Sequence, residues 1–582
     1  MEGGDIFIQD FINDLQDSPE SQVQKCFRGS NILITGGTGF VGKVLIEKLL
    51  RTCHELNMIY IIVRTLNEQN PHDRVKMMFN SPLFDRMKIE NPGYANQVQV
   101  ISGEILRKNL GITEIDYIKL KYKVNIIIHL AGITTHNNCN LRSAIFTNIR
   151  ATNDLVSLAK GFTDLKAFIH ISSVFAHHAL VNIHEQFYSF PIPINTMIQM
   201  AETIPDHIMN GLAKELVSEW PDVVTYTKAA SEKIIQSAGR DFPACIIRPG
   251  FVLGTANEPI AGWTNHTNNL IVYTLGSGLG LVRTFHGSLV NANIIPVDML
   301  VNLILVACWD MIGSKSLDFI NEELPCDITE TPIYNFVLSN HKCCSWKQLG
   351  EYFFMSEKRV SSFNSYFRIP FCYIAETMGL YRTVSFIFHT LPAKVVDIYF
   401  TMSGKEPRLS KFYEGVHKSA EHLNLYQQMR IRCYNHNVYR LMNKLSPRDR
   451  ALFCFDISTL SWNDYFDKYV KGLRVYLMGN RLQMATSTNT INSSHRTDFF
   501  QRYVKRSQIV SSRRHYPQKL KKFIENCMDQ HNFFMRNNIY NNPFYIQDIN
   551  KELANHVAFG IIHQFFKIKH YLKICIEAFF FL

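Results

Sequence analysis

A glycine-rich turn between a short apolar run and a helical pattern is the strongest chemical signal in this chain. Residues 31–35 read NILIT, an apolar, β-branched run that is typical of a buried strand. The turn after this run comprises Thr35, Gly36, Gly37, Thr38, Gly39, Phe40, Val41 and Gly42. Residues 43–50 then show helical periodicity, and a second apolar run covers residues 58–63. Strand, glycine turn, helix and strand in this order predict a βαβ unit that binds a dinucleotide.

The spacing of the glycines gives each of them a separate role. Gly36 permits the tight turn out of the strand, Gly39 lets the backbone approach a pyrophosphate, and Gly42 lets the helix pack on the strand. Backbone amides at the N-terminus of the helix then face the phosphates. A structural glycine turn without a ligand is the alternative interpretation.

The residue at the end of the second strand indicates which dinucleotide is bound. An NAD site usually carries an acid there for the ribose hydroxyls, whereas this chain carries Arg64 with no acid beside it. A guanidinium suits a 2′-phosphate, so NADPH is favoured over NADH, with a solvated surface arginine as the alternative. The next strand, over residues 98–101, is followed by Glu104, a candidate hydrogen-bond acceptor at the edge of the adenine.

Further strands alternate with helices along the first half of the chain. We expect strands over residues 31–35, 58–63, 98–101, 125–130, 167–171 and 244–247, with helices over 73–87, 117–122 and 143–160. This alternation predicts an α/β fold built on a doubly wound parallel sheet. Ligands bind at the carboxyl edge of such sheets. That edge should collect the glycine turn, Arg64, Ala131 with Gly132, Ser172 with Ser173, and Arg248 with Pro249.

Composition sets limits on the class of protein. The chain has 582 residues, 46% of them hydrophobic, and a net charge of +11. That length favours two or more domains. The 13 cysteines are scattered, without a Cys-x-x-Cys pair, so neither a disulfide framework nor a zinc site is expected. The N-terminus lacks the pattern of a signal peptide.

The basic charge is concentrated in the last hundred residues. From Arg481 onward there are 15 lysines and arginines against 6 acids, an excess of 15 − 6 = 9. The rest of the chain is close to neutral, so no nucleic-acid partner is expected. A solvated basic tail is the simpler reading, and contact with anionic lipid is the alternative. The apolar segments 371–399 and 556–582 are interrupted by charges, so peripheral membrane contact is expected rather than a clean span.

Several longer motifs resemble one family, the alcohol-forming fatty acyl-CoA reductases. The motifs in the first half are TGGTGFVGKVLIEKLL (35–50), HISSVF (170–175), WP (220–221), TKAASE (227–232), EP (258–259) with GW (262–263), and IPVDM (295–299). The later motifs are LPA (391–393), GK (404–405), LS (445–446) with DR (449–450), Trp462 and GLR (472–474). The resemblance covers roughly residues 25–480 and implies a Rossmann-type reductase of the extended short-chain class, followed by a mainly helical C-terminal domain.

The resemblance also implies a division of the chain. An N-terminal arm would cover residues 1–27, an NADP-binding reductase domain 28–340, a helical domain 341–480, and a basic, Asn-rich tail of unknown fold 481–582. Members of the family often end in a membrane anchor. The resemblance therefore implies an intracellular protein on the cytosolic face of the endoplasmic reticulum or the peroxisome.

Catalytic residues follow from the same resemblance. Lys228 matches the family's lysine, whose cation lowers the pKa of the catalytic tyrosine, and Asn148 matches the asparagine that supports this lysine through water. Ser173 matches the hydroxyl that hydrogen-bonds the substrate carbonyl, with Ser172 in reserve, and Arg248 matches a turn near the nicotinamide. No metal is expected.

The family's tyrosine, four residues before the lysine, is missing. Position 224 is a valine, which has no proton to give, and Tyr226 lies only two residues before Lys228. Two residues rotate a helix by about 200°, so Tyr226 would reach the site only if the start of the helix were shifted or unwound.

The resemblance implies that NADPH reduces a long-chain fatty acyl-CoA to a primary alcohol and that CoA is released. Two alternatives remain open. A non-catalytic or impaired relative could bind nucleotide and acyl ligand, as Val224 suggests. A reductase or epimerase of the same fold could act on another carbonyl compound, although the motifs after residue 391 argue against it.

Overall fold

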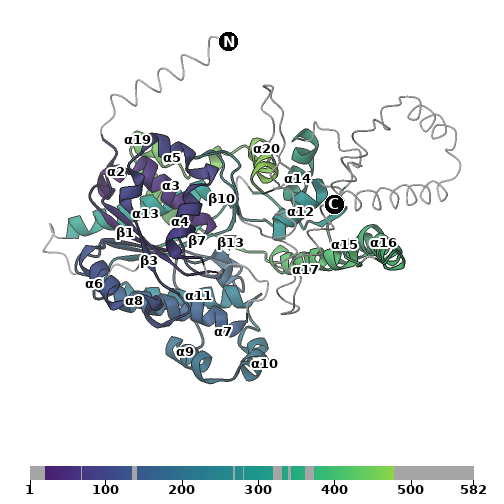
Figure 1. Ribbon diagram of the computed structural model, residues 1–582, viewed down its shortest axis with the longest axis horizontal. Helices are drawn as coiled ribbons and strands as arrows, with labels where there is room; N and C mark the ends of the chain where they lie inside the picture. Colours follow the sequence, from purple (N-terminus) through teal and green to yellow (C-terminus); the bar gives the residue numbers. More distant parts are fainter. Residues whose placement is uncertain are drawn as a thin grey trace, which may run out of the picture. The chain divides into compact units, whose positions relative to one another are not determined.

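The computed structural model describes most of the chain up to residue 477 (Figure 1). The described ranges are 20–66, 69–133, 140–265, 269–278, 281–318, 331–338, 343–360, 372–404 and 406–477. The first 19 residues of the predicted arm and the whole predicted tail therefore lie outside the described residues.

A seven-stranded parallel sheet forms the centre of the larger part of the fold. Its strands are β1 (Asn31–Thr35), β2 (Met58–Val63), β3 (Val98–Ser102), β4 (Ile126–His129), β5 (Ala167–Ile171), β7 (Ala244–Pro249) and β11 (Ile333–Phe336). The order is β11-β7-β5-β4-β1-β2-β3, and every pair is parallel. The order reverses between β1 and β4, the switch point at which such sheets bind ligands. The predicted doubly wound parallel sheet is confirmed.

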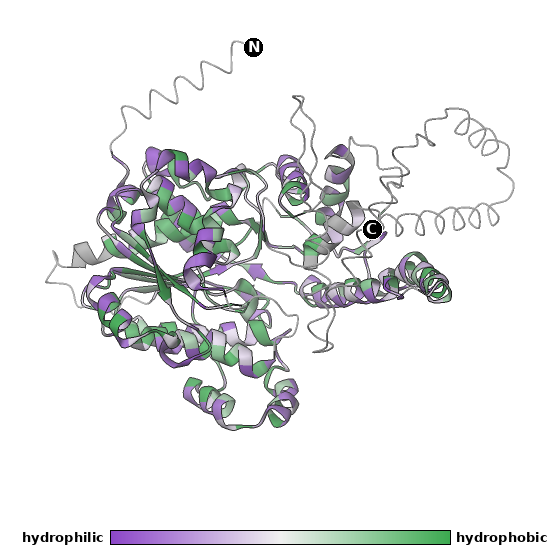
Figure 2. Ribbon diagram, in the orientation of Figure 1, coloured by the Kyte–Doolittle hydropathy of each residue, from purple (hydrophilic) through white to green (hydrophobic). Residues whose placement is uncertain are grey.

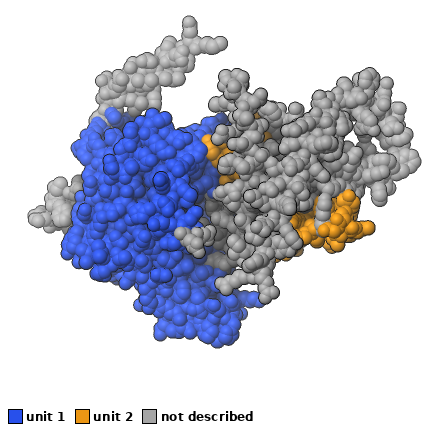
Figure 3. Space-filling model, in the orientation of Figure 1, with its two compact units in different colours: residues 1–266, 290–346, 425–472 blue, residues 267–289, 347–424, 473–582 orange. Residues whose placement is uncertain are grey.

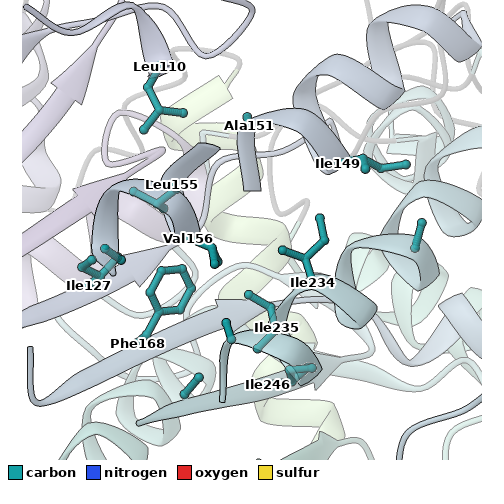
Figure 4. Close-up of a cluster of buried hydrophobic side chains, with 14 of the residues drawn as sticks. Leu110, Ile127, Ile149, Ala151, Leu155, Val156, Phe168, Ile234, Ile235 and Ile246 are labelled. Atoms are coloured by element: carbon teal, nitrogen blue, oxygen red, sulfur yellow. The ribbon is translucent and has the colours of Figure 1, made fainter. Parts of the chain in front are cut away.

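Helices cover both faces of this sheet (Figure 1). One face carries α2 (Gln22–Phe27), α3 (Phe40–Thr52) and α13 (Val297–Asp318). The other carries α6 (Glu114–Lys123), α8 (Ala151–Ala159) and α11 (Val223–Ala238). The core on this second face is largely aliphatic with several aromatic rings, and Figure 4 shows part of it, with side chains from strands and helices pointing toward one another. Its members include Ile127, Phe168 and Ile246 from the strands and Leu155, Val156 and Ile234 from the helices.

Two of the expected helices are interrupted. The pattern over 73–87 forms α4 (Pro71–Phe79) and α5 (Asp85–Glu90), because Pro82 starts a separate 3₁₀ turn, η1 (Pro82–Phe84). The pattern over 143–160 forms α7 (Leu141–Ala144), a π-helical turn η4 (Ile145–Arg150) and α8. Such π turns are rare and often occur at functional sites.

The described residues fall into two compact units (Figure 3). Unit 1 comprises 1–266, 290–346 and 425–472, and unit 2 comprises 267–289, 347–424 and 473–582. This division differs from the predicted boundary near residue 340, because the segment after residue 424 returns to unit 1. There β13 (Arg432–Cys433) pairs with β6 (Asn182–Ile183), and Tyr465 on α20 (Trp462–Gly472) donates a hydrogen bond to the carbonyl of Gly254 at 2.9 Å.

Shorter elements complete the two units. Unit 1 also contains η2 (Tyr94–Gln97), η3 (Lys108–Gly111), η5 (Val174–His177), α9 (Ile194–Thr203), α10 (Asp206–Leu216), β8 (Phe251–Leu253), β10 (Ile294–Pro296), α18 (His436–Lys444), α19 (Pro447–Leu452) and η8 (Ile457–Thr459). Unit 2 contains α12 (Asn269–Gly278), β9 (Thr284–His286), β12 (Tyr373–Ala375), α15 (Met378–Ser385), η7 (Phe386–Thr390), α16 (Leu391–Met402) and η9 (Leu473–Leu477), with most of α14 (Trp346–Val360) and α17 (Leu409–Gln427). Among the described residues, no helix combines the length and the apolar character that a membrane span requires.

A buried histidine links the carboxyl ends of β1 and β4. The hydroxyl of Thr152 donates to the carbonyl of Asn148 at 2.7 Å, so its oxygen accepts from Nε2 of His129 at 3.0 Å. Nδ1 of His129 then accepts from the hydroxyl of Thr35 at 2.7 Å, and Thr35 Oγ1 accepts from the amide of Ala131 at 3.2 Å. Burial, with a smaller effect of the Lys228 charge, lowers the pKa of His129 to about 3, so the ring is neutral.

This neutral ring makes stability depend on pH. The unfolded histidine binds a proton below its ordinary pKa of about 6.5, whereas the folded one does not until far lower pH. Between these two values, acid therefore favours unfolding by up to about 1.4 kcal/mol per pH unit. We expect His129→Gln, which keeps one donor and one acceptor, to lose less stability than the native chain between pH 7 and pH 5 in urea unfolding. Replacing the exposed His72 with glutamine is the control, and an unchanged pH slope in His129→Gln would contradict the assignment.

Candidate active site

The glycine turn after β1 is packed so tightly that side chains are excluded. Gly36 has a φ of +73°, and a Cβ there would lie 2.7 Å from the amide nitrogen of Ala131. A Cβ on Gly37 would meet Ile61 at 2.8 Å, and one on Gly42 would overlap the backbone of Gly36. Gly39 is the N-cap of α3, and no side chain caps this helix end. The turn can thus offer backbone amides to an anion, as the sequence predicts.

Two arginines are joined at the end of β2. Arg64 is exposed there, and Nη1 of Arg74, from the first turns of α4, donates to the carbonyl of Arg64. Burial, with a further contribution from the Arg64 charge, lowers the pKa of Arg74. Arg74 was not predicted, because nothing in the sequence shows that α4 turns back toward the end of β2. Glu104 is half-buried, and its carboxylate accepts from the amide of Leu106 at 3.3 Å, so its contact with adenine stays a prediction.

Lys228, Asn148 and Gly132 come together beside the carboxyl end of β4. A Cβ on Gly132 would lie 3.0 Å from both Nζ of Lys228 and Oδ1 of Asn148. Nζ of Lys228 donates to the carbonyl of Ile171 at 2.7 Å, and burial, partly offset by Glu232, lowers the pKa of Lys228 to about 8.

The π-helical turn η4 carries Asn148. Its amide nitrogen donates to the hydroxyl of Thr227 at 2.9 Å, and its amide oxygen accepts from the backbone of Ile133 at 2.8 Å. The predicted lysine and asparagine are therefore neighbours in the fold.

The two serines after β5 have different roles. Ser172 is buried, and its hydroxyl donates to the carboxylate of Glu232. Ser173 is half-buried and caps the 3₁₀ turn η5, where its oxygen accepts from the amide of Phe175 at 3.3 Å. The hydroxyl proton of Ser173 can donate to a ligand while this cap persists. The geometry thus favours Ser173 over Ser172 as the residue that binds a carbonyl.

Glu232, one helical turn after Lys228, is the centre of a buried ionic network. Its carboxylate accepts from Nη2 of Arg248 at 2.7 Å and pairs with Nε2 of His177 at 2.8 Å. Burial alone would raise the pKa of Glu232, but the charges of Arg248 and His177 outweigh burial and hold this pKa well below its usual range. Glu232 was not predicted as a site residue, although its spacing of four residues from Lys228 places it on the same helix face.

The guanidinium of Arg248 is bound to groups of the protein itself rather than turned toward a ligand site. Its side chain is fully buried, and beyond Glu232 it donates to the carbonyls of His184 and Gln186 at 3.1 and 3.0 Å. Arg248 therefore anchors the end of β7 to the loop after β6. Its predicted contact with the cofactor stays a prediction.

Tyr226 is not part of the cluster. Helix α11 begins regularly at Val223, with Asp222 as its N-cap accepting from the amide of Thr225 at 2.8 Å, so its start is neither shifted nor unwound. Tyr226 has no exposed surface and belongs to the apolar core on the opposite face of the helix.

The surroundings of Tyr226 also argue against proton transfer. Its ring packs against Phe190 and Trp220, with centroid distances of 5.2 and 5.1 Å. Its hydroxyl has no hydrogen-bond partner among the described residues, and burial raises the pKa of Tyr226 to about 12. The structure corrects the inclusion of Tyr226 among the catalytic residues, and the buried Val224 occupies the position one turn before Lys228.

Models of known families match two parts of the chain. A nucleotide-binding model described as "Male sterility protein" matches residues 34–304, and a model named Sterile, with the same description, matches residues 388–480. Among solved structures, the reductase domain of a nonribosomal peptide synthetase from Mycobacterium tuberculosis is similar with a TM-score of 0.52 and 16% identity, over 80% of this chain and 95% of that one. The terminal R domain of the myxalamid pathway has a TM-score of 0.50 and 17% identity, over 77% of this chain and 91% of that one. These likenesses concern the fold.

Curated relatives are similar over most of their length. "Fatty acyl-CoA reductase wat" of Drosophila melanogaster is 34% identical over 80% of this chain and 87% of its own. Human "Fatty acyl-CoA reductase 1" is 31% identical over 79% of this chain and 87% of its own. Together with the nucleotide turn and the cluster around Lys228, these matches show that the chain belongs to the fatty acyl-CoA reductase family of oxidoreductases.

Proposed function

We propose that this protein uses NADPH to reduce a long-chain fatty acyl-CoA to a primary fatty alcohol, with release of CoA. The observation that carries the proposal is the grouping of Lys228, Asn148 and Gly132 beside the glycine turn at the switch point of the sheet. Membership of the family supports a fatty acyl substrate. Attachment to the cytosolic face of the endoplasmic reticulum or the peroxisome is a further proposal that follows from the family.

The residues at the switch point fit a nicotinamide dinucleotide. Gly39, the exposed N-cap of α3, has no Cβ to obstruct a pyrophosphate, and Gly36, Gly37 and Gly42 allow the tight packing of the turn behind it. Arg64 and Arg74 together suit the extra phosphate that distinguishes NADPH from NADH. When bound, the cofactor supplies hydride from its nicotinamide ring.

The chain's own groups would hold and protonate the substrate. Ser173 can donate a hydrogen bond to the carbonyl oxygen and so stabilise the negative charge that develops there. Lys228, fixed by the carbonyl of Ile171, adds a positive charge nearby. Val224 has no proton to give, so we assign the proton to the Ser173 hydroxyl or to a water bonded to it.

If NADPH is the cofactor, substitution of Arg64 or Arg74 should weaken its binding, whereas substitution of another surface arginine should not. We expect Arg64→Ser and Arg74→Ser each to weaken NADPH binding by on the order of tenfold and to leave NADH binding unchanged, because only NADPH carries the 2′-phosphate. Fluorescence titration of the purified full chain measures both affinities. Arg86→Ser, on the exposed surface of α5, is the matched control. Equal losses for the two cofactors would count against a 2′-phosphate site.

Because the family's tyrosine is missing at position 224, we expect the native chain to turn over slowly and a tyrosine placed there to raise kcat. A positioned general acid contributes about 10²- to 10⁴-fold to rate, so Val224→Tyr should raise kcat by on the order of 10²-fold. Val223→Tyr is the control, because position 223 lies about 100° around the helix from position 224. Alcohol formed from a long-chain acyl-CoA, measured by gas chromatography, gives the rates. A Val224→Tyr variant no faster than the native chain would show that protonation does not limit turnover.

Val224 also favours a second candidate, a protein that binds nucleotide and acyl ligand without turnover. Membership of a reductase family favours the enzyme over this alternative. NADPH binding without any alcohol, in both the native chain and Val224→Tyr, would support the alternative and overturn the proposed reaction.

A further inference from the structure

One helical run in unit 2 turns apolar side chains toward solvent. α15, the π turn η7 and α16 follow one another without a break from Met378 to Met402. The exposed apolar side chains on this run, here called the apolar stripe, are Leu380, Phe386, Ile387, Leu391, Val395, Ile398, Tyr399 and Met402. Ile398 is 60% exposed and Met402 is 84% exposed. Single exposed apolar residues are normal, but a continuous series along one helix marks an interaction surface.

Two polar residues of the same run, His389 and Asp397, point inward, whereas an ordinary surface helix turns such residues toward solvent. His389 is fully buried, and its Nε2 accepts from the amide of Arg283 at 2.8 Å. Asp397 is buried, and its carboxylate accepts from the amides of Arg408, Leu409 and Ser410 at 2.7 to 3.0 Å. The run therefore buries these two polar side chains within the unit, while the apolar stripe lies outside.

Unit 2 does not use the stripe for its own core. A separate cluster is formed by Ala393, Val396 and Phe400 on the inner side of α16, packed against Leu409 and Tyr413 of α17. Figure 2 shows the apolar residues of α15 and α16 in green. The stripe is thus apolar surface that the fold does not need for packing among the described residues.

The charges on the run favour an anionic partner. Arg382 and Lys394 are exposed, whereas Asp397, the single acid between residues 378 and 402, is buried. Lys394 follows Leu391 by three residues and precedes Ile398 by four, so it lies along the stripe itself. Arg382 pairs with the exposed Glu421 at 3.3 Å, a contact of little energetic weight in water. A helix with an apolar face, aromatic residues and flanking cations is the pattern that lies in a membrane interface.

We propose that the apolar stripe rests in the interface of an anionic lipid membrane, with Lys394 among the headgroups. Long side chains such as lysine can place their charge at the headgroups while their methylene stems lie among apolar groups. This contact requires no reductase activity, so its failure and the failure of the proposed function are separate results. If the membrane contact and the proposed function are both correct, the stripe places the enzyme at the lipid in which long acyl chains dissolve.

The first test places a reporter on the stripe. The full-length Tyr399→Trp variant is mixed with vesicles of phosphatidylcholine and phosphatidylserine whose acyl chains carry bromine, which quenches tryptophan. We expect quenching beyond that of the native chain, because position 399 enters the interface. Tyr439→Trp, a half-exposed position on α18 of unit 1, is the control and should show none. No added quenching at position 399 overturns the proposal, and membrane binding by another part of the chain cannot imitate this signal.

The second test removes the stripe. The triple variant Val395→Ser, Ile398→Ser and Met402→Ser should bind these vesicles at least about tenfold more weakly, because less apolar area is buried in the interface. The matched control is Met77→Ser, Ile89→Ser and Ile115→Ser, which changes exposed residues of unit 1. NADPH binding checks that both variants fold, and if the triple variant fails this check, quenching at position 399 decides. A native dimer that the triple variant converts to a monomer, with vesicle binding unchanged, would assign the stripe to a second copy and overturn the proposal.

Discussion

The burial of one cation, the ammonium of Lys228, is the constraint on which the site depends. A buried ammonium is costly unless nearby groups compensate for the lost water. The carbonyl of Ile171 accepts a hydrogen bond from this ammonium at 2.7 Å, and Glu232 lies one turn further along the same helix. A side chain at position 132 would crowd the same cation, since a Cβ on Gly132 would lie 3.0 Å from Nζ of Lys228. The ends of β4 and β5, the π turn and α11 are therefore fixed around a single charge.

Glu232 extends this constraint toward the substrate side. It binds Ser172, His177 and Arg248, which belong to the loop after β5 and to β7. Ser173 follows Ser172 directly in the chain. The position of the Ser173 hydroxyl therefore depends on the Glu232 carboxylate, although Glu232 itself need not contact a ligand. Buried networks of this kind are stable only when every member is satisfied. None of these contacts of Glu232 involves position 224, where this chain carries valine.

Much of the fold could be predicted because local patterns and tertiary packing agree in the sheet. The apolar runs of β1, β2 and β5, and the glycines between β1 and α3, lie where the sequence indicated. Ser173 was predictable as a site residue from the strand ends, which gather at one edge of a parallel sheet, whereas Lys228 and Asn148 were predicted through the resemblance to the family. Contacts between distant segments were not predictable. Arg74 reaches Arg64 only because α4 turns back, and Pro82 divides a pattern that looked continuous.

Tyr226 shows that the spacing of residues in a sequence motif does not by itself place a side chain in the site. A tyrosine near a lysine suggested a proton donor, but the helix begins regularly at Val223 and directs Tyr226 into the core between Phe190 and Trp220. In unit 2, the apolar residues after 371 likewise suggested lipid contact without showing which face was available. The structure shows that Asp397 and His389 point inward while Ile398 and Met402 point outward.

The proposed reaction transfers hydride from bound NADPH to a fatty acyl thioester. The most direct measurement is mass spectrometry of the alcohol formed from a long-chain acyl-CoA and NADPH deuterated at both C4 positions of the nicotinamide. Two successive reductions at the same carbon predict two deuterium atoms on carbon 1 of the alcohol, with one CoA released per alcohol. Alcohol without deuterium at carbon 1, or no product from a chain that binds NADPH, would contradict the account.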